Sequence, residues 1–537
     1  MTGKDKLAAG LTALGTAGAL LSPTAAAADS AALVHTDRGP VRGIVAEDHR
    51  SFLGIPYAAP PVGELRWRAP RPAPAWTQPR EATSPGPMCA QTGDHLGGSS
   101  TSEDCLYLNV TTPRTRTRQK LPVMVWLHGG SFKDGAGHLY DARRLVAQGN
   151  VIVVTVNYRL GAFGFLAHPA LREPDGLSGN YGLADQQAAL RWVRRNAAAF
   201  GGDPRNVTLF GESSGAIAVC AHLAAPSSAG LFHRAILQSA PCTAPWSPSL
   251  AMANNPRPLA QAERDGRALA ERLGLGESAT AGQLRAVPAD QLLQAASDVA
   301  QPGFGPAVGG AFLPQNPARA VAAGRFARVP VLYGINRHEE RMHVWGLEMA
   351  KYRGPIPADR YDEEVRAAFG VHADEVLARY PLSAYASPGQ ALATALTDAE
   401  YARPAFDTGK ALSRQVPTYA YEFADPAAPW FAAFPKPYDM GAYHAAELPY
   451  LFDVGYNQPL TSPQGHLADQ MIGYWTRFAR TGDPNGSGAP AWHRFTTARP
   501  HVQSLAPGDD GIKPADFARD HRYDFWTSLN GSHGRAD

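Results

Sequence analysis

The chain of 537 residues has no marked excess of either charge and no long run of charged residues. It carries 50 Lys and Arg against 48 Asp and Glu, a formal net charge of +2. Nucleic acids and anionic membrane surfaces are usually bound by clustered basic residues. The sequence therefore gives no indication of either partner, whereas its 44% of hydrophobic residues predicts a folded protein with a large core.

No stretch after residue 28 is apolar enough to span a bilayer. Before it, Lys4 and Lys6 precede an apolar stretch, Leu7–Leu21, and small residues follow at Pro23–Ala28. This pattern predicts a secretory signal peptide over residues 1–28, cleaved before Asp29. The alternative is an uncleaved membrane anchor, but the stretch is shorter than the ~20 residues of a spanning helix. We expect a mature protein that is soluble and secreted, either extracellular or periplasmic.

Cysteine is scarce, with four residues in the whole chain. In an exported protein an even number favours disulfides. Cys89 and Cys105 bracket a short polar loop that a disulfide would fix. Cys220 and Cys242 fall where a helix and the exit of the next strand are expected, and here a disulfide and two buried free thiols both remain possible.

Internal repeats and low-complexity linkers are also absent, and apolar strands alternate with helical patterns instead. This alternation predicts an α/β fold with a large, mostly parallel sheet and helices on both faces. We expect one domain, 29–537, with helical insertions around 250–325 and 345–440. An antiparallel hairpin is expected at a sheet edge over Leu33–Val45, and a Gly- and Pro-rich tail after Arg480.

One pentapeptide, Gly211-Glu-Ser-Ser-Gly215, interrupts an apolar run at the point where a helical pattern begins. The run Val207–Phe210 predicts a buried strand, and Ala216–Leu223 predicts a helix. Ser213 would then sit on a sharp strand-to-helix turn, where flanking glycines let the backbone pass close to its neighbours. The motif alone also fits an ordinary loop serine. In this setting Ser213 is a candidate nucleophile.

A serine nucleophile needs a base, an acid that orients the base, and donors for the oxyanion. His128-Gly-Gly-Ser131 directly follows a predicted strand, and its small residues would expose backbone N–H groups. Glu339 follows the strand Val329–Tyr333, and His444 precedes another apolar segment. The order serine, acid, histidine is the order expected of α/β-hydrolases.

Together these motifs resemble the type-B carboxylesterase family, which includes the cholinesterases. Phe200–Gly215 is similar to the family's nucleophile signature, and Glu103–Pro113 is similar to its second signature. Further matching motifs are Gly54–Ala58, Pro60–Gly63, Asn157–Gly161, Gly179–Gln186 and Phe478–Asn485. The resemblance runs from about residue 33 to the end of the chain.

The resemblance implies an α/β-hydrolase fold and a serine esterase that acts on small-molecule esters without a metal or an organic cofactor. It assigns Ser213 as nucleophile, Glu339 as acid and His444 as base. The oxyanion donors would be the N–H groups of Gly130, Ser131 and Ser214, with Gly129 completing the loop. The sequence gives no indication of oligomeric state.

The chain departs from the family pattern at several positions. Glu340 stands where a glycine often follows the acid, so Glu340 is the alternative acid, and Ala445 replaces a glycine after the histidine. Leu275 and Gln283 stand near the places of a second disulfide in many animal members. A disulfide between Cys220 and Cys242 would therefore not correspond to the second disulfide of those animal members.

Another departure concerns the substrate. The loop between the first two cysteines, 90–104, contains no aromatic residue, whereas cholinesterases carry a tryptophan there that stacks on choline. This argues against a choline-selective site. Two alternatives remain: a lipase or polyester hydrolase on the same scaffold, and a non-catalytic binding module. The retained candidates for all three triad positions argue against the second.

Overall fold

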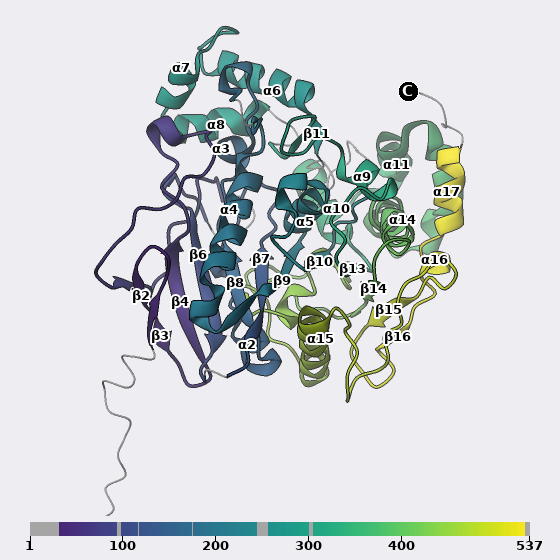
Figure 1. The fold of residues 1–537 in the computed structure, drawn as a ribbon. Helices are drawn as coiled ribbons and strands as arrows, with labels where there is room; N and C mark the ends of the chain where they lie inside the picture. Colours follow the sequence, from purple (N-terminus) through teal and green to yellow (C-terminus); the bar gives the residue numbers. More distant parts are fainter. Residues whose placement is uncertain are drawn as a thin grey trace, which may run out of the picture.

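The computed structural model of the chain describes residues 32–93, 98–115, 118–173, 176–243, 256–299 and 304–531. The predicted signal peptide, residues 1–28, lies outside the described residues. The centre of the molecule is an eleven-stranded sheet in the order β16-β15-β14-β13-β10-β9-β7-β8-β6-β4-β3 (Figure 1). Neighbours from β15 to β8 pair in parallel, whereas the pairs at both edges are antiparallel. The predicted α/β architecture is confirmed.

The strands of this sheet are β3 (Ile44–Val45), β4 (His49–Pro56), β6 (Tyr107–Pro113), β7 (Leu121–Leu127), β8 (Ile152–Val156), β9 (Gly202–Glu212), β10 (Arg234–Gln238), β13 (Val331–Asn336), β14 (Thr418–Phe423), β15 (Val502–Leu505) and β16 (Lys513–Pro514). The remaining described strands are β1 (Leu33–His35), β2 (Pro40–Arg42), β5 (Arg80–Glu81), β11 (Arg257–Pro258) and β12 (Ala307–Val308).

The central strands are apolar on both faces because helices cover both. In β7 every residue is buried, and successive side chains enter different cores. Val123 and Val125 belong to one core, and Met124 and Trp126 to the other. A strand buried on both faces carries a continuous apolar run rather than an alternating one. The sequence of β7 is therefore that of a central strand in a parallel sheet.

The described α-helices are α2 (Arg143–Gly149), α3 (Gly161–Phe165), α4 (Tyr181–Asn196), α5 (Ser214–Ala224), α6 (Leu259–Arg272), α7 (Ala281–Ala286), α8 (Ala289–Val299), α9 (Pro317–Ala322), α10 (Arg341–Leu347), α11 (Tyr361–Phe369), α12 (Ala373–Arg379), α13 (Pro388–Leu396), α14 (Arg403–Leu412), α15 (Ser462–Thr481), α16 (Phe517–Asp520) and α17 (Tyr523–Gly531). Helices α4 and α5 pack on the face with Val123, and α2 and α15 pack on the face with Met124. A separate core joins α11, α12 and α13 to Trp526 of α17, and α11 and α17 lie beside each other in Figure 1.

The predicted N-terminal hairpin forms, and its first strand lies at the edge of a small separate sheet. β1 pairs with β2, and both belong to a separate three-stranded sheet with β5, while β3 forms the edge of the main sheet. The chain passes from one sheet to the other at Gly43. A Cβ atom at this position would lie 2.4 Å from the carbonyl oxygen of Ser51, so the close approach requires glycine.

The C-terminal part is more ordered than its predicted tail. After α15 the chain adds β15 and β16 to the sheet and ends in α16 and α17. These elements are short, and the four-residue strand β15 contains the polar pair Gln503-Ser504. Such a strand has too few residues to show a periodic pattern. The range 345–440 also includes the sheet strand β14, at the residues where the apolar run Thr418–Phe423 predicts a buried strand.

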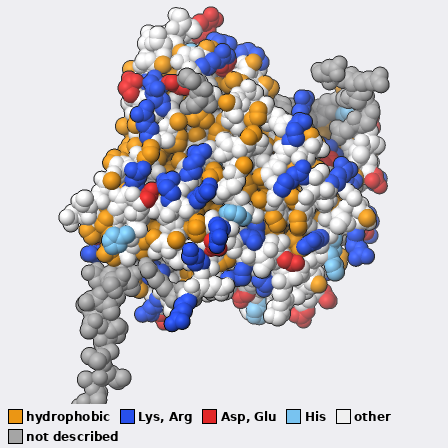
Figure 2. Space-filling view, in the orientation of Figure 1, with side chains coloured by type: hydrophobic (Ala, Val, Ile, Leu, Met, Phe, Trp, Pro, Cys, Tyr) orange, Lys and Arg blue, Asp and Glu red, His pale blue; other side chains and the backbone are white. Residues whose placement is uncertain are grey.

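Both cysteine pairs are disulfide-bonded, Cys89 with Cys105 and Cys220 with Cys242. The second bond joins α5 to the segment after β10, which the sequence had left open. Within the described residues, no helix is long and apolar enough to cross a membrane. Lys and Arg side chains are dispersed among apolar and acidic ones on the face that Figure 2 shows.

Candidate active site

Ser213 lies on a strained turn between β9 and α5. Its φ of 54° and ψ of −126° fall in a region that non-glycine residues rarely adopt. Gly215 makes the turn possible, because a Cβ atom there would lie 2.1 Å from the carbonyl oxygen of Leu127 at the end of β7. A Cβ atom at Gly211 would lie 2.6 Å from the carbonyl carbon of Gly215. The Ser213 N–H donates to the Gln238 carbonyl (2.9 Å), which fixes the turn to the end of β10.

The loop after β7 lies directly against Ser213. A Cβ atom at Gly129 would lie 3.1 Å from the Cβ of Ser213. Gly130 and Ser131 both have positive φ angles, and the Gly130 carbonyl accepts from the N–H of Asp134 (3.1 Å). Within the described part of the chain, we find no backbone acceptor for the N–H groups of Gly130, Ser131 or Ser214.

His444 and Glu339 meet although 105 residues separate them. Nδ1 of His444 lies 2.6 Å from Oε2 of Glu339. The other carboxylate oxygen of Glu339 accepts from the N–H of Asn336 (2.8 Å), at the end of β13. The His338 N–H donates to the Ala442 carbonyl (2.9 Å). This bond directly joins the turn that carries Glu339, residues 337–340, which we call the acid turn, to the loop that carries His444.

Glu340, the alternative acid, points elsewhere. Its Oε1 lies 3.6 Å from Nδ1 of His343, while its neighbour Glu339 is the one in contact with His444. The ring of His343 in turn lies 5.0 Å from the ring of His444, and that of Tyr401 lies 5.8 Å away. Two adjacent glutamates thus face two different histidines.

The second nitrogen of His444 faces the serine turn. Nε2 lies 3.2 Å from Oε1 of Glu212, the residue before Ser213. Burial raises the pKa of the Glu212 carboxyl, because water no longer stabilises its charge. Burial alone would lower the pKa of His444, but the carboxylates of Glu212 and Glu339 outweigh it and raise that pKa above its ordinary value. The imidazolium is therefore strongly stabilised at this site.

A buried hydrogen-bonded chain behind these residues was not predicted from the sequence. Glu447 accepts from the side chains of Gln238 (2.9 Å) and Asn336 (2.7 Å). Gln238 also accepts from the Trp475 indole (3.0 Å). The chain links the end of β10, to which the serine turn is hydrogen-bonded, with the end of β13, which precedes the turn of Glu339. Glu447 follows His444 by three residues, a spacing that could have drawn attention to it, whereas nothing in the sequence distinguishes Gln238 or Asn336.

The described residues contain no group of three or more His, Cys, Asp or Glu side chains that could hold a metal ion. The site combines a strained serine, a loop whose N–H groups have no backbone acceptor among the described residues, and a buried histidine–carboxylate pair. In chemical terms these can supply a nucleophile, oxyanion donors and a base.

The fold identifies the class of the protein as an α/β-hydrolase. The candidate active site lies at the carboxyl ends of the parallel strands, where this class places its sites. The family model described as "Carboxylesterase family" matches residues 30–526. The chain belongs to this family, and is a carboxylic ester hydrolase.

Relatives and solved structures support the same family assignment. The chain is 37% identical over 487 residues to the para-nitrobenzyl esterase of Bacillus subtilis (strain 168), covering 86% of this chain and 93% of that one. It is 36% identical over 500 residues to the fumonisin B1 esterase of Sphingopyxis macrogoltabida, covering 89% and 87%. The structure of a thermophilic PNB esterase matches with a TM-score of 0.75 at 33% identity, covering 92% and 99%.

Proposed function

We propose that the protein is a secreted serine carboxylesterase that works through an acyl-enzyme. Ser213 attacks the ester carbonyl, and His444 takes its proton and passes it to the leaving alcohol. Glu339 holds the imidazole in the required tautomer, and the N–H groups of Gly130, Ser131 and Ser214 stabilise the oxyanion beside Gly129. Water then releases the acyl group. The contact of His444 with Glu339 at 2.6 Å, beside a strained serine turn, carries the proposal.

The proposal extends to the whole chain. Residues 1–28 direct export and are removed, and residues 29–537 form one catalytic domain. The two disulfides support an oxidising destination, since such bonds persist outside the cytosol. The test is the N-terminal sequence of protein recovered from the medium or periplasm, which we expect to start at Asp29.

The nucleophile is tested by intact-mass analysis after reaction with an organophosphonate probe. Wild-type protein should gain the mass of one phosphonyl group, and Ser213→Ala should gain none, because the probe bonds to an activated serine. Labelling that survives the substitution would refute Ser213 as the nucleophile.

Substrate class is tested with p-nitrobenzyl and p-nitrophenyl esters. A p-nitrobenzyl ester is the natural first substrate, given the relative named for that activity. We expect hydrolysis of short acyl chains in solution. A preference for long chains, with activation at an oil–water surface, would instead favour a lipase.

A further inference from the structure

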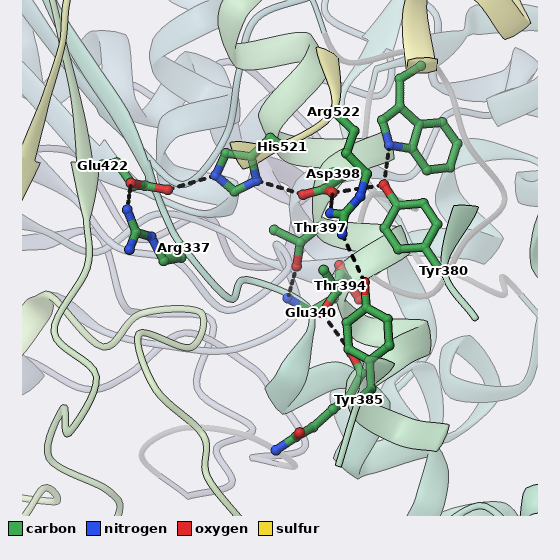
Figure 3. A network of polar contacts seen from close by, with 12 residues as sticks. Arg337, Glu340, Tyr380, Tyr385, Thr394, Thr397, Asp398, Glu422, His521 and Arg522 are labelled. Atoms are coloured by element: carbon green, nitrogen blue, oxygen red, sulfur yellow. Dashed lines mark hydrogen bonds and ion pairs between the residues drawn. The ribbon is translucent and has the colours of Figure 1, made fainter. Parts of the chain in front are cut away.

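A second buried histidine lies between two carboxylates on the C-terminal side of the molecule. Figure 3 shows His521 placed between Asp398 and Glu422. Its Nδ1 is 2.6 Å from Asp398 Oδ1, and its Nε2 is 2.7 Å from Glu422 Oε1. His521 is 5% exposed, and the two carboxylates are 1% and 0% exposed. We call Arg337, Asp398, Glu422, His521 and Arg522 the His521 cluster.

The geometry requires His521 to donate from both nitrogens, because ionised carboxylates only accept. Burial would lower its pKa, but Asp398 and Glu422 outweigh it and raise the pKa to about 10. Two arginines pair with the remaining carboxylate oxygens. Arg337 contacts Glu422 Oε2 (2.5 Å), and Arg522 contacts Asp398 Oδ2 (3.0 Å). A buried imidazolium is stable here because it is fully paired.

One arm of the cluster reaches the acid turn from β14. Glu422 lies in β14 and binds the guanidinium of Arg337, two residues before Glu339. The backbone reinforces this contact, since the Arg337 N–H donates to the Phe423 carbonyl (2.9 Å). Glu422 is thus held by His521 on one oxygen and holds the start of the acid turn with the other.

The other arm reaches the same turn at its other end, Glu340. Thr397, the neighbour of Asp398, accepts the Glu340 N–H on its hydroxyl oxygen (3.1 Å; Figure 3). Both residues lie in a short π-helix, Thr397–Ala402, whose Tyr401 ring lies 5.8 Å from the ring of His444. A shift of this segment would move the turn and the catalytic histidine together.

We propose that His521 is a positioning residue for the catalytic acid. By bridging Asp398 and Glu422, it fixes both sides of the turn 337–340, so that Glu339 meets His444. The inference rests on the proposed function, because it assigns a role to a residue that acts through Glu339.

The test compares kinetic constants of wild type and His521→Ala on a p-nitrophenyl ester. Rates are normalised to sites titrated with the phosphonate probe, at a temperature well below the unfolding midpoint of both proteins. We expect kcat to fall between about tenfold and a hundredfold with KM within about twofold, since small misplacements of catalytic groups have effects of this size.

A second readout is the pH dependence of kcat/KM. His444 faces the carboxylates of Glu212, Glu339 and Glu447 and the rings of His343 and Tyr401. A displaced Glu339 would stabilise the imidazolium less, so the acid limb should move to lower pH in His521→Ala. A loss of stability alone would leave the limb unchanged.

Trp526→Phe is the matched control. The Trp526 indole donates to the Tyr380 hydroxyl (2.7 Å), which in turn donates to Asp398 (2.8 Å). This substitution removes a buried hydrogen bond from the same region without touching either arm. It should lower the unfolding midpoint while leaving kcat and the acid limb at their wild-type values.

If His521→Ala does not fold, Thr397→Val and Arg337→Gln each break one arm, and each should lower kcat in the same sense. Unchanged kcat per titrated site in the folded variants, with a wild-type acid limb, would overturn the positioning role while leaving the esterase proposal intact. A wild-type protein that neither hydrolyses esters nor takes the probe would refute the proposed function, and the role of His521 with it.

Discussion

The two halves of the candidate site are built in different ways. The serine turn comes from one continuous stretch, β9 to α5, and its close contacts are with the ends of the neighbouring strands β7 and β10. The histidine–acid half is assembled from two loops 105 residues apart, and the His521 cluster reaches it from a third segment. Local backbone geometry fixes the first half, whereas long-range side-chain contacts fix the second.

A strained turn can be recognised from a local stretch of sequence, whereas the contact between the histidine and its acid depends on the whole fold. Substitutions in the serine half should therefore either remove the nucleophile or disturb the packing of this one turn. Substitutions in the histidine–acid half should change the orientation of the His444 ring or its protonation.

Ser213→Ala should lower kcat on the order of a millionfold, because removing the nucleophile disables the triad as a unit. The residual rate should come from the oxyanion donors and substrate binding. The measurement is ester hydrolysis at saturating substrate, with near-wild-type unfolding as the control for folding. A residual kcat within a hundredfold of wild type would contradict the assignment.

Glu339→Gln and Glu340→Gln form a matched pair, adjacent and both buried. Glu339→Gln should lower kcat by about ten-thousandfold, because a neutral amide no longer fixes the tautomer of His444. Glu340→Gln should change kcat much less, since Glu340 faces His343. The comparison is made on kcat per titrated site, and the reverse order of effects would make Glu340 the acid.

The sequence predicted the serine half almost completely and the other half only by residue identity. The sharp turn requires glycine at positions 211 and 215, and Ser213 stands between them. The strand, the turn and the helix could therefore be predicted from this short stretch alone. Glu339 and His444 were selected by their order and by resemblance, because nothing local brings them together. Glu447 and His521 were missed, since a buried charge becomes recognisable only once its partners from distant elements are known.

The same limit explains which parts of the fold the sequence could not predict. The N-terminal hairpin was correctly predicted as a pair, but which sheet it joins depends on the close approach of Gly43 to Ser51. The short strand β15 adds to the sheet through its register with β14 rather than through its own composition. Both features depend on neighbours that are distant in the chain.

Gly215→Ala should destabilise the serine half through packing alone. Its Cβ would lie 2.1 Å from the Leu127 carbonyl oxygen, so the backbone must shift, at a cost of about 1–3 kcal/mol or more. Gly282→Ala in α7 is the control, because a Cβ atom there meets nothing within 4 Å and alanine favours helix by up to about 1 kcal/mol. Chemical denaturation measures both, and equal stabilities would contradict the tight packing of the turn.

The pH dependence of kcat/KM tests the histidine–acid half. His444 acts as a base only when neutral, so activity must fall as pH drops through its pKa. The neighbouring carboxylates raise that pKa, which places the acid limb above the ordinary value for histidine. Glu212→Gln removes a negative charge 3.2 Å from Nε2, and the limb should therefore move to lower pH, by about one unit.

A wild-type rate that stays flat down to about pH 4 would exclude His444 as the base. A limb that Glu212→Gln leaves in place would instead show that the carboxylates of the histidine–acid half, Glu339 and Glu447, set the protonation of His444, which would make the serine and histidine halves electrostatically independent.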